Sequence, residues 1–143
     1  MKIYFGLGSN LGDRANLIQT AVNKLETPDL RLIQLSSLYE TEPIGFLDQP
    51  EFLNAVAEFE SDLPPRELLN RALAVERDMG RVRTIKNGPR NIDIDLILAG
   101  DLEVNEPDLI VPHPRYKERD FVMRPLRELQ LREPGASVRP AKG

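Results

Sequence analysis

Apolar side chains in the first third of the chain recur first with the period of a strand and then with that of a helix. Residues 3–7 predict a short strand, and a glycine-bearing loop follows it. Asp13 is a good N-cap for the helix that the apolar spacing between residues 17 and 25 predicts, and Pro28 ends that helix. Residues 30–39 are again β-prone, and we expect this segment to pair with the first strand.

The middle of the chain repeats this order. Residues 52–59 predict a strand with one wholly apolar face, whereas the other face includes the amide of Asn54. Pro65 suits the first turn of a helix with an apolar stripe, and Gly80 suits the position just after its end. Residues 92–98 predict a further strand, because polar and apolar positions alternate there again.

The pattern beyond residue 98 predicts shorter elements. Gly100-Asp101 is a two-residue turn signal, so we expect a hairpin between residues 92–98 and residues 102–104. Residues 121–129 predict a short helix that packs the end of the fold. The order strand, helix, strand, strand, helix, strand is that of a ferredoxin-like split βαβ sandwich, an α+β fold. We expect a largely antiparallel sheet, helices packed on one face and long active-site loops.

Composition adds limits to this picture. The chain has 143 residues, no cysteine and a formal net charge of −4, which excludes thiolate chemistry and argues against a general nucleic-acid binder. No apolar run approaches the ~20 residues that span a bilayer, and residues 1–6 lack a signal-peptide pattern. We expect a cytoplasmic monomer with no nucleic-acid or membrane partner. One domain should cover residues 1–130, followed by a polar tail over residues 131–143.

Two aspartates on the predicted strand at residues 92–98 carry the clearest candidate chemistry. Asp93 and Asp95 should share one face roughly 7 Å apart, because strand side chains at i and i+2 point the same way. Carboxylates this close repel each other, and such hard oxygen ligands suit Mg²⁺, which takes one or two carboxylates together with substrate phosphates. Arg90 adds a planar fork suited to phosphate oxygens. The alternative is that the pair lies on a solvated strand edge.

A basic segment precedes the aspartates and favours the metal–phosphate interpretation. Residues 77–90 carry five basic side chains against one acid, although the protein as a whole is acidic. A positive segment that leads into a carboxylate pair is typical of a site for a polyphosphate bound with magnesium. A P-loop after the first strand is disfavoured, because the glycines there lack the Gly-Lys-Ser/Thr ending.

Three polar residues each allow two interpretations. Asn54 is either an exposed strand position or an amide that reads the hydrogen-bonding edge of a ligand. Glu76 lies on or beside the buried stripe of the second helix, where it either pairs with Arg77 or Arg81 or reaches a ligand. His113 is the one histidine of the chain and is held between two prolines, so we interpret it as a positioned donor rather than a structural residue.

Several short motifs, taken together and in order, resemble one family. They are Gly8-Ser9-Asn10, Thr41-x-Pro43 with Asp48-Gln49-Pro50-x-Phe52-x-Asn54, Gly80-Arg81-x-Arg83, Gly88-Pro89-Arg90-x-Ile92-Asp93-Ile94-Asp95-Leu96, and Pro112-His113-Pro114 with Arg119-x-Phe121-Val122. From about Ile3 to Leu129 the chain is similar to the 6-hydroxymethyl-7,8-dihydropterin pyrophosphokinases of folate biosynthesis. Gly-Pro-Arg-x-Ile-Asp-x-Asp is highly specific, whereas each other motif alone is weak.

The resemblance implies an activity and a pterin site. A pyrophosphoryl group would pass from ATP to the hydroxymethyl oxygen of the pterin, with release of AMP. The pterin would stack between Phe52 and Phe121. Its ring edge would be read by Asn54 and by the backbone near residues 41–44. The residues implied in that segment are Thr41, Pro43 and Ile44.

The resemblance also implies the ATP and metal residues. Asp93 and Asp95 would hold two Mg²⁺ ions that bridge the ATP phosphates. The residues implied to contact ATP are Glu76, Arg81, Arg83, Arg90, His113 and Arg119. We expect Arg81, Arg90 and Asp95 to be catalytic, with Asp95 the best candidate for a general base. Some family members carry a tryptophan where this chain has Asn87, so nucleotide packing and loop closure should differ in detail.

Two other classes of function compete with this interpretation. A ferredoxin-like RNA-binding module would use the basic segment at residues 77–90, with Tyr4 and Phe52 as stacking residues, but the chain has no RNP-like run. A purely structural βαβ domain would leave the joint occurrence of the aspartate pair, Arg90 and His113 unexplained.

Overall fold

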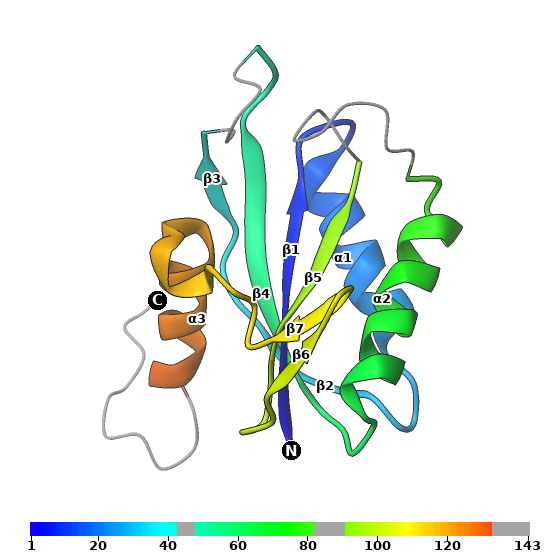
Figure 1. The fold of residues 1–143 in the computed structure, drawn as a ribbon. Coiled ribbons are helices and arrows are strands. Elements are labelled where there is room, and N and C mark those ends of the chain that lie inside the picture. The colour runs from blue at the N-terminus through cyan, green and yellow to red at the C-terminus, as the bar shows by residue number, and fades with distance from the viewer. Residues whose placement is uncertain (43–47, 82–90, 133–143) are drawn as a thin grey trace.

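One antiparallel sheet organises the protein, with β1 and β4 as its interior strands (Figure 1). The computed structural model describes residues 1–42, 48–81 and 91–132. The strand order is β2–β4–β1–β5, and the short β3 pairs with β4. The strands of this sheet are β1 (Lys2–Ser9), β2 (Arg31–Leu35), β3 (Tyr39–Thr41), β4 (Phe52–Glu60) and β5 (Asp93–Ala99).

The remaining described elements lie on or beside this sheet. They are α1 (Arg14–Leu25), α2 (Pro65–Asp78), β6 (Val104–Glu106), β7 (Leu109–Val111), the 3₁₀ helix η1 (Tyr116–Glu118) and α3 (Asp120–Leu131). The order β1-α1-β2-β4-α2-β5 and the antiparallel pairing confirm the predicted ferredoxin-like α+β fold.

Helices α1 and α2 cover one face of the sheet, as their apolar stripes predict (Figure 1). The side chain of Asp13 accepts from the backbone N–H of Asn16 and caps α1. Gly80 follows α2 with a φ of 78°, a conformation that glycine adopts without strain. The main core lies between these helices and alternate strand residues: Ile3, Phe5, Leu7, Ile18, Ala21, Val22, Ala55, Ala57, Phe59, Leu68, Ala72, Ile94 and Leu96.

Helix α3 packs on the opposite face and forms a second core. Val122, Leu126 and Leu129 of α3 meet Tyr4 of β1 and Val56 of β4 there. The expectation that the helices would pack on one face is therefore wrong, because α3 covers part of the opposite face. Its amphipathic stripe is buried like those of α1 and α2, but on the other side of the sheet (Figure 1).

The expected pairing of residues 30–39 with the first strand is also wrong. Both edges of β1 are taken, by β4 and by β5, and β2 instead pairs with β4. The segment also divides into two strands, both paired with β4, because at Ser36 a side-chain hydroxyl bonds to β4 where a backbone carbonyl would continue the ladder. The Ser36 backbone N–H donates to the Val56 carbonyl, and its hydroxyl accepts from the Val56 N–H. Beyond Ser36, β3 continues along β4.

The hairpin follows β5 rather than including it. β6 pairs with β7 in a separate two-stranded sheet. The outer edge of β5 is used by other groups: Ile94 N–H donates to the Glu76 carboxylate, and the Ile97 carbonyl accepts from His113 N–H. The turn at Gly100 therefore leads the chain away from the main sheet. The predicted hairpin between residues 92–98 and 102–104 is wrong, and of residues 102–104 only Val104 belongs to β6.

The structure tests the predicted C-terminal helix but describes little of the predicted tail. The short helix predicted over residues 121–129 is confirmed as α3. The polar tail over residues 131–143 falls almost wholly outside the described residues. Among the helices that the structure describes, none is long and apolar enough to cross a membrane.

Candidate active site

The two aspartates of β5 lie on the sheet face that carries α3, beyond the part that α3 covers. In the β1–β5 register, Gly6 is opposite Asp95 and Gly8 is opposite Asp93. Gly8 is also opposite Asn54 on the other side. Asp93 and Asn54 therefore flank one glycine, roughly 10 Å apart across two strand spacings. The alternation predicted from the sequence is confirmed, and it brings the acidic pair and the amide onto one surface.

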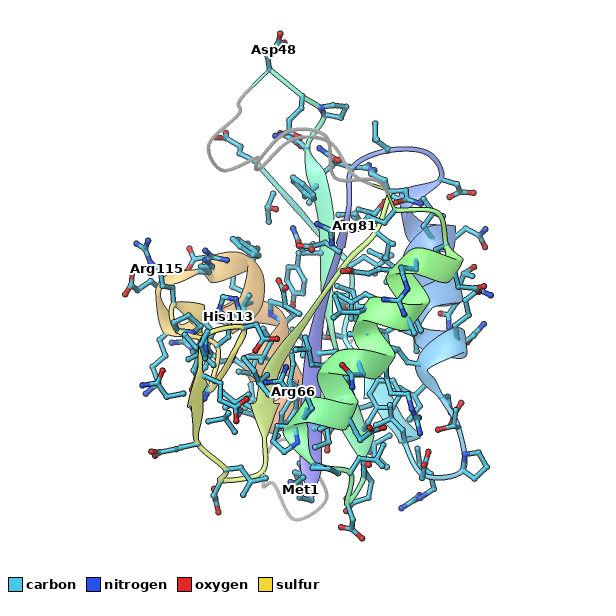
Figure 2. The ribbon with its side chains drawn as sticks, turned by 45° about the vertical axis from the view of Figure 1, so that its right-hand side comes forward. Met1, Asp48, Arg66, Arg81, His113 and Arg115 are labelled. Atoms are coloured by element: carbon cyan, nitrogen blue, oxygen red, sulfur yellow. The ribbon has the colours of Figure 1, made fainter. Side chains whose placement is uncertain are left out.

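A buried network fixes the start of β5. One guanidinium nitrogen of Arg81 donates to Glu76 Oε2 at 2.7 Å and to Asp93 Oδ1 at 2.6 Å, and Glu76 Oε2 also accepts from Ile94 N–H at 2.7 Å. Only 7% of the Arg81 side chain and 6% of the Glu76 side chain are exposed. Of the two partners considered for Glu76, Arg81 is therefore the one it holds. Figure 2 shows Arg81 where α2 ends beside β5.

Asp95 differs from Asp93 in its environment. Burial raises the pKa of Asp95 from its ordinary value of 3.8 to about 7, and the charges of Asp93 and Glu76 act in the same direction. The positive charges of Arg81 and Arg119 oppose this shift. A carboxyl that is costly to ionise beside a second carboxylate is the environment that a bound cation would relieve.

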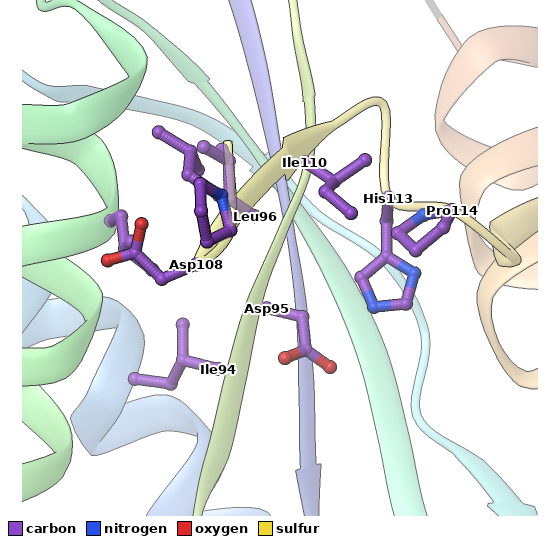
Figure 3. A pocket seen from close by; sticks show the side chains of 10 residues that line it. Ile94, Asp95, Leu96, Asp108, Ile110, His113 and Pro114 are labelled. Atoms are coloured by element: carbon purple, nitrogen blue, oxygen red, sulfur yellow. The ribbon is translucent and has the colours of Figure 1, made fainter. Parts of the chain in front are cut away.

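His113 belongs to the same cluster of charges. It stands after a cis Val111–Pro112 peptide, and its N–H bond to Ile97 holds it against β5. Burial lowers the pKa of His113, Arg119 lowers it further and Asp93 raises it. Figure 3 shows the imidazole on the same side of β5 as the Asp95 carboxylate. In the part of the chain that the structure describes, the buried His113 Nδ1 and Arg81 Nε atoms have no hydrogen-bond partner.

A groove of about 270 Å³ opens along the outer edge of β5, next to Asp95 and His113 (Figure 3). Its walls come from α2, β5 and the β6–β7 hairpin. Most of its lining is apolar: Leu69, Ile94, Leu96, Pro107, Leu109, Ile110 and Pro114. Such a groove accommodates a flat apolar group whose polar end reaches the charged cluster.

Asn54 is buried, so the interpretation of an exposed strand position is wrong. It is 7% exposed, and its Nδ2 donates to the hydroxyl of Thr41 on the neighbouring β3. A Cβ atom at Gly8 would lie 2.8 Å from Asn54 Oδ1, so glycine is needed there for the amide to occupy its place. The close approach at this glycine is therefore made by a side chain of β4.

The two aromatic residues predicted for the pterin site lie on β4 and in the first turn of α3. Phe52 alternates with Asn54 on β4 and is 8% exposed. Phe121 lies in the first turn of α3 and packs against the second core, and the Arg119 guanidinium lies 5.6 Å from its ring centre. Those residues predicted for the pterin site that the structure describes thus come from β3, β4 and the start of α3.

Four predicted site residues lie outside the described residues. They are Pro43, Ile44, Arg83 and Arg90. The predictions for loop closure and for Asn87 also concern this part of the chain. Of the described candidates, Glu76, Arg81, Asp93, Asp95, His113 and Arg119 interact directly or through their charges.

The comparison with known proteins agrees with this geometry. The family model of 7,8-dihydro-6-hydroxymethylpterin-pyrophosphokinase (HPPK) matches residues 4–131. The chain belongs to this family. It is 42% identical to the 2-amino-4-hydroxy-6-hydroxymethyldihydropteridine pyrophosphokinase of Bacillus subtilis, over 88% of this chain and 76% of that protein. It is 41% identical to the Pseudomonas aeruginosa protein of the same name, over 90% of this chain and 80% of that protein.

Longer relatives also contain this unit. The chain is 40% identical to the folic acid synthesis protein fol1 of Pneumocystis carinii, with 99% of this chain matched but only 18% of that protein. It therefore spans less than a fifth of that relative's length. None of these names supports the RNA-binding alternative, and α3 covers Tyr4, which such a module would need for stacking.

Sequence reasoning missed two parts of the site. Leu69 and Ile110 line the groove, but an apolar residue on a helix or a short strand carries no signal of a ligand. Asn10 donates to Gln49 Oε1 and to the Pro50 carbonyl, and so ties the loop after β1 to the segment that enters β4. Asn10 and Gln49 belong to motifs quoted above, yet only the fold shows that they meet.

The raised pKa of Asp95 predicts a pH-dependent effect on stability. Between pH 4 and pH 7 the folded chain binds more protons than the unfolded chain, so this carboxyl makes the protein less stable as the pH rises. In Asp95→Asn this penalty is absent. In magnesium-free buffer at pH 8, we expect the variant to gain on the order of 2 kcal/mol in free energy of unfolding, and the gain should shrink toward pH 4. Urea denaturation of both proteins at pH 8 and pH 4 measures this gain. Equal stability of the variant and the wild-type protein at pH 8 would contradict the raised pKa of Asp95.

The close contact between Gly8 and Asn54 predicts a loss of pterin affinity in Gly8→Ala. The added methyl must displace the Asn54 amide and break its bond to Thr41, so we expect the KM for the pterin to rise about tenfold or more. Gly6→Ala is the matched control on the same strand, because its Cβ would meet only Ile97, at 3.4 Å. An equal rise in pterin KM for the two variants would show that the Asn54 position is not the cause.

Proposed function

We propose that this chain transfers a pyrophosphoryl group from ATP to the hydroxymethyl oxygen of 6-hydroxymethyl-7,8-dihydropterin, giving AMP and the pterin diphosphate of folate biosynthesis. The observation that supports it most is the shared surface of Asp93, Asp95 and Asn54. Two carboxylates suited to a magnesium–phosphate complex lie two strands from an amide suited to a pterin edge. Membership of the HPPK family gives this pairing its chemical meaning.

The groove beside β5 supports a place for ATP. A purine ring is flat and largely apolar, and the Leu69, Leu96 and Ile110 side chains offer such a ring a matching wall. A base bound there would direct its phosphates toward His113 and Asp95, which line the same groove. Arg119 lies close enough to both to shift their pKa values, so its charge is available to a phosphate.

The acidic pair suits magnesium by its donor chemistry. Asp93 and Asp95 supply carboxylate oxygens, and the described residues hold no group of three or more histidine or acidic side chains that could form an all-protein site. Magnesium typically completes its six ligands from water and substrate phosphates when a protein offers only one or two carboxylates. Bound there, the ions, two in our proposal, would neutralise phosphate charge.

The protein's own contribution is positioning and charge. Glu76 and Asp93 hold Arg81 in one orientation, so its guanidinium meets a phosphate without having to be ordered first. Asn54 and the walls formed by Phe52 and Phe121 would orient the pterin so that its hydroxyl attacks the β-phosphorus in line with the departing AMP. Asp95 is our candidate for accepting the hydroxyl proton, because its carboxylate lies on the sheet surface that we propose for the metal, the phosphates and the pterin.

Some expectations about the whole protein stay predictions. They are that it acts as a cytoplasmic monomer, that it binds no nucleic acid, and that Arg83 and Arg90 add to the phosphate contacts. Gel filtration would test whether the protein is a monomer. A nucleic-acid binding assay would test whether it binds nucleic acid.

The proposal is tested by turnover of purified wild-type protein and Asp95→Asn with ATP, the pterin alcohol and Mg²⁺. We expect wild-type protein to release AMP and form the pterin diphosphate, and the variant to lose at least about 10³-fold in kcat, because a neutral amide cannot hold the metal as a carboxylate does. Asp101→Asn is the control, since Asp101 is an exposed acid in the turn after the same strand. AMP is measured by chromatography, and full activity in Asp95→Asn would overturn the metal assignment.

A further inference from the structure

One carboxylate away from the charged cluster joins three segments of the chain. Glu128 on α3 accepts from the Ser37 hydroxyl at 2.7 Å, from the Ser37 N–H at 3.1 Å and from the Tyr39 hydroxyl at 2.7 Å. Arg132, which follows the last residue of α3, also donates to it and donates to the Leu35 carbonyl. The side chain of Glu128 is only 18% exposed. A surface acid with this many partners has a defined place.

The face of α3 that carries Glu128 also carries an aromatic wall of the proposed pterin site. Phe121, Arg124 and Glu128 are spaced by three and four residues, so they line up along one side of the helix. About 10 Å of rigid helix separates Phe121 from Glu128. The Arg124 guanidinium lies over the Tyr39 ring at 5.0 Å, which gives α3 a second attachment to the same tyrosine.

The partner segment carries the polar part of that site. Tyr39 is opposite Asn54 in the β3–β4 register, and Thr41 is opposite Phe52. Thr41 accepts the hydrogen bond that orients the Asn54 amide. Glu128 therefore connects the helix that presents Phe121 to the strand that presents Thr41.

We propose that Glu128 is a positioning residue for pterin binding, which fixes the distance between the Phe121 wall and the Thr41–Asn54 pair. The inference rests on the proposed function of this surface. A flat ring held between an aromatic face and an amide edge requires both to stay in register, and a misplacement of about 1 Å is enough to weaken binding or catalysis substantially. The two groups come from different elements, and Glu128 is the hydrogen-bonded link between them.

Other contacts keep α3 on the sheet without Glu128. Val122, Leu126 and Leu129 are buried in the second core, and Gln34 donates to the Leu129 carbonyl at 3.1 Å. Loss of the carboxylate should therefore leave the helix docked while freeing β3 to shift against it. A role in positioning thus makes a prediction different from that of a general role in stability: the effect should fall on the pterin and not on ATP, whose proposed groove lies at β5.

The test compares Glu128→Gln with wild-type protein in steady-state turnover, with the pterin and ATP varied separately. The amide has nearly the same shape, but one of its ends is a donor that faces the donors of Ser37 or Tyr39. We expect the KM for the pterin to rise about tenfold and the KM for ATP to change less than about twofold. Glu118→Gln, a change to an exposed acid that pairs only with Arg115 at 3.2 Å among the contacts described, is the matched control.

Tyr39→Phe is the second variant, because it removes one hydrogen bond to Glu128 and keeps the ring beneath Arg124. We expect a smaller rise in pterin KM, and less than the sum of the two effects in the double variant. An unchanged pterin KM in Tyr39→Phe and Glu128→Gln, or equal rises for pterin and ATP, would overturn the inference. If Glu128→Gln does not fold, Tyr39→Phe decides alone. No transfer by wild-type protein would instead overturn the proposed function, and this inference with it.

Discussion

The buried carboxylate of Glu76 is the interaction on which the candidate active site depends. It accepts from the Ile94 backbone and from Arg81, and Arg81 in turn bonds Asp93. One acid at the end of α2 thereby fixes the first residues of β5 and the guanidinium beside them. An unpaired charge at this depth would be costly, so the carboxylate and the guanidinium require each other. The carboxyl of Asp95 stays costly to ionise beside this pair, as its raised pKa shows. A bound cation would lower that cost.

The rest of the fold places the surface around Asn54 of β4 beside the start of β5. β1 lies between the acidic strand and the amide strand, and glycine at position 8 lets Asn54 lie against it. α3 covers part of the same sheet face (Figure 1), and Phe121 in its first turn packs against the second core. The edge proposed for phosphate and the surface proposed for the pterin ring therefore belong to one sheet, which suits a reaction whose catalysis depends on alignment.

Local patterns predicted most of this arrangement, and long-range pairing explains what they missed. Alternation placed Asp93 and Asp95 on one face, and Asp13 and Gly80 marked helix ends, because each of these depends on neighbouring residues alone. The partner of β2 and the face chosen by α3 are set by elements far along the chain, which a period cannot identify. Glu128 carried no signal at all, since its partners lie 89 and 91 residues away and an acid on a helix surface is ordinarily solvated.

Calorimetric titration of the pterin alcohol into wild-type protein tests the central claim most directly, because it reports the joint surface before any chemistry occurs. The titration is made with Mg²⁺ and a non-hydrolysable ATP analogue both present, and then with each omitted. Binding that needs the nucleotide and the metal together is the result predicted by a site in which the acidic edge and the amide surface act as one. Absence of binding under all of these conditions would contradict the account.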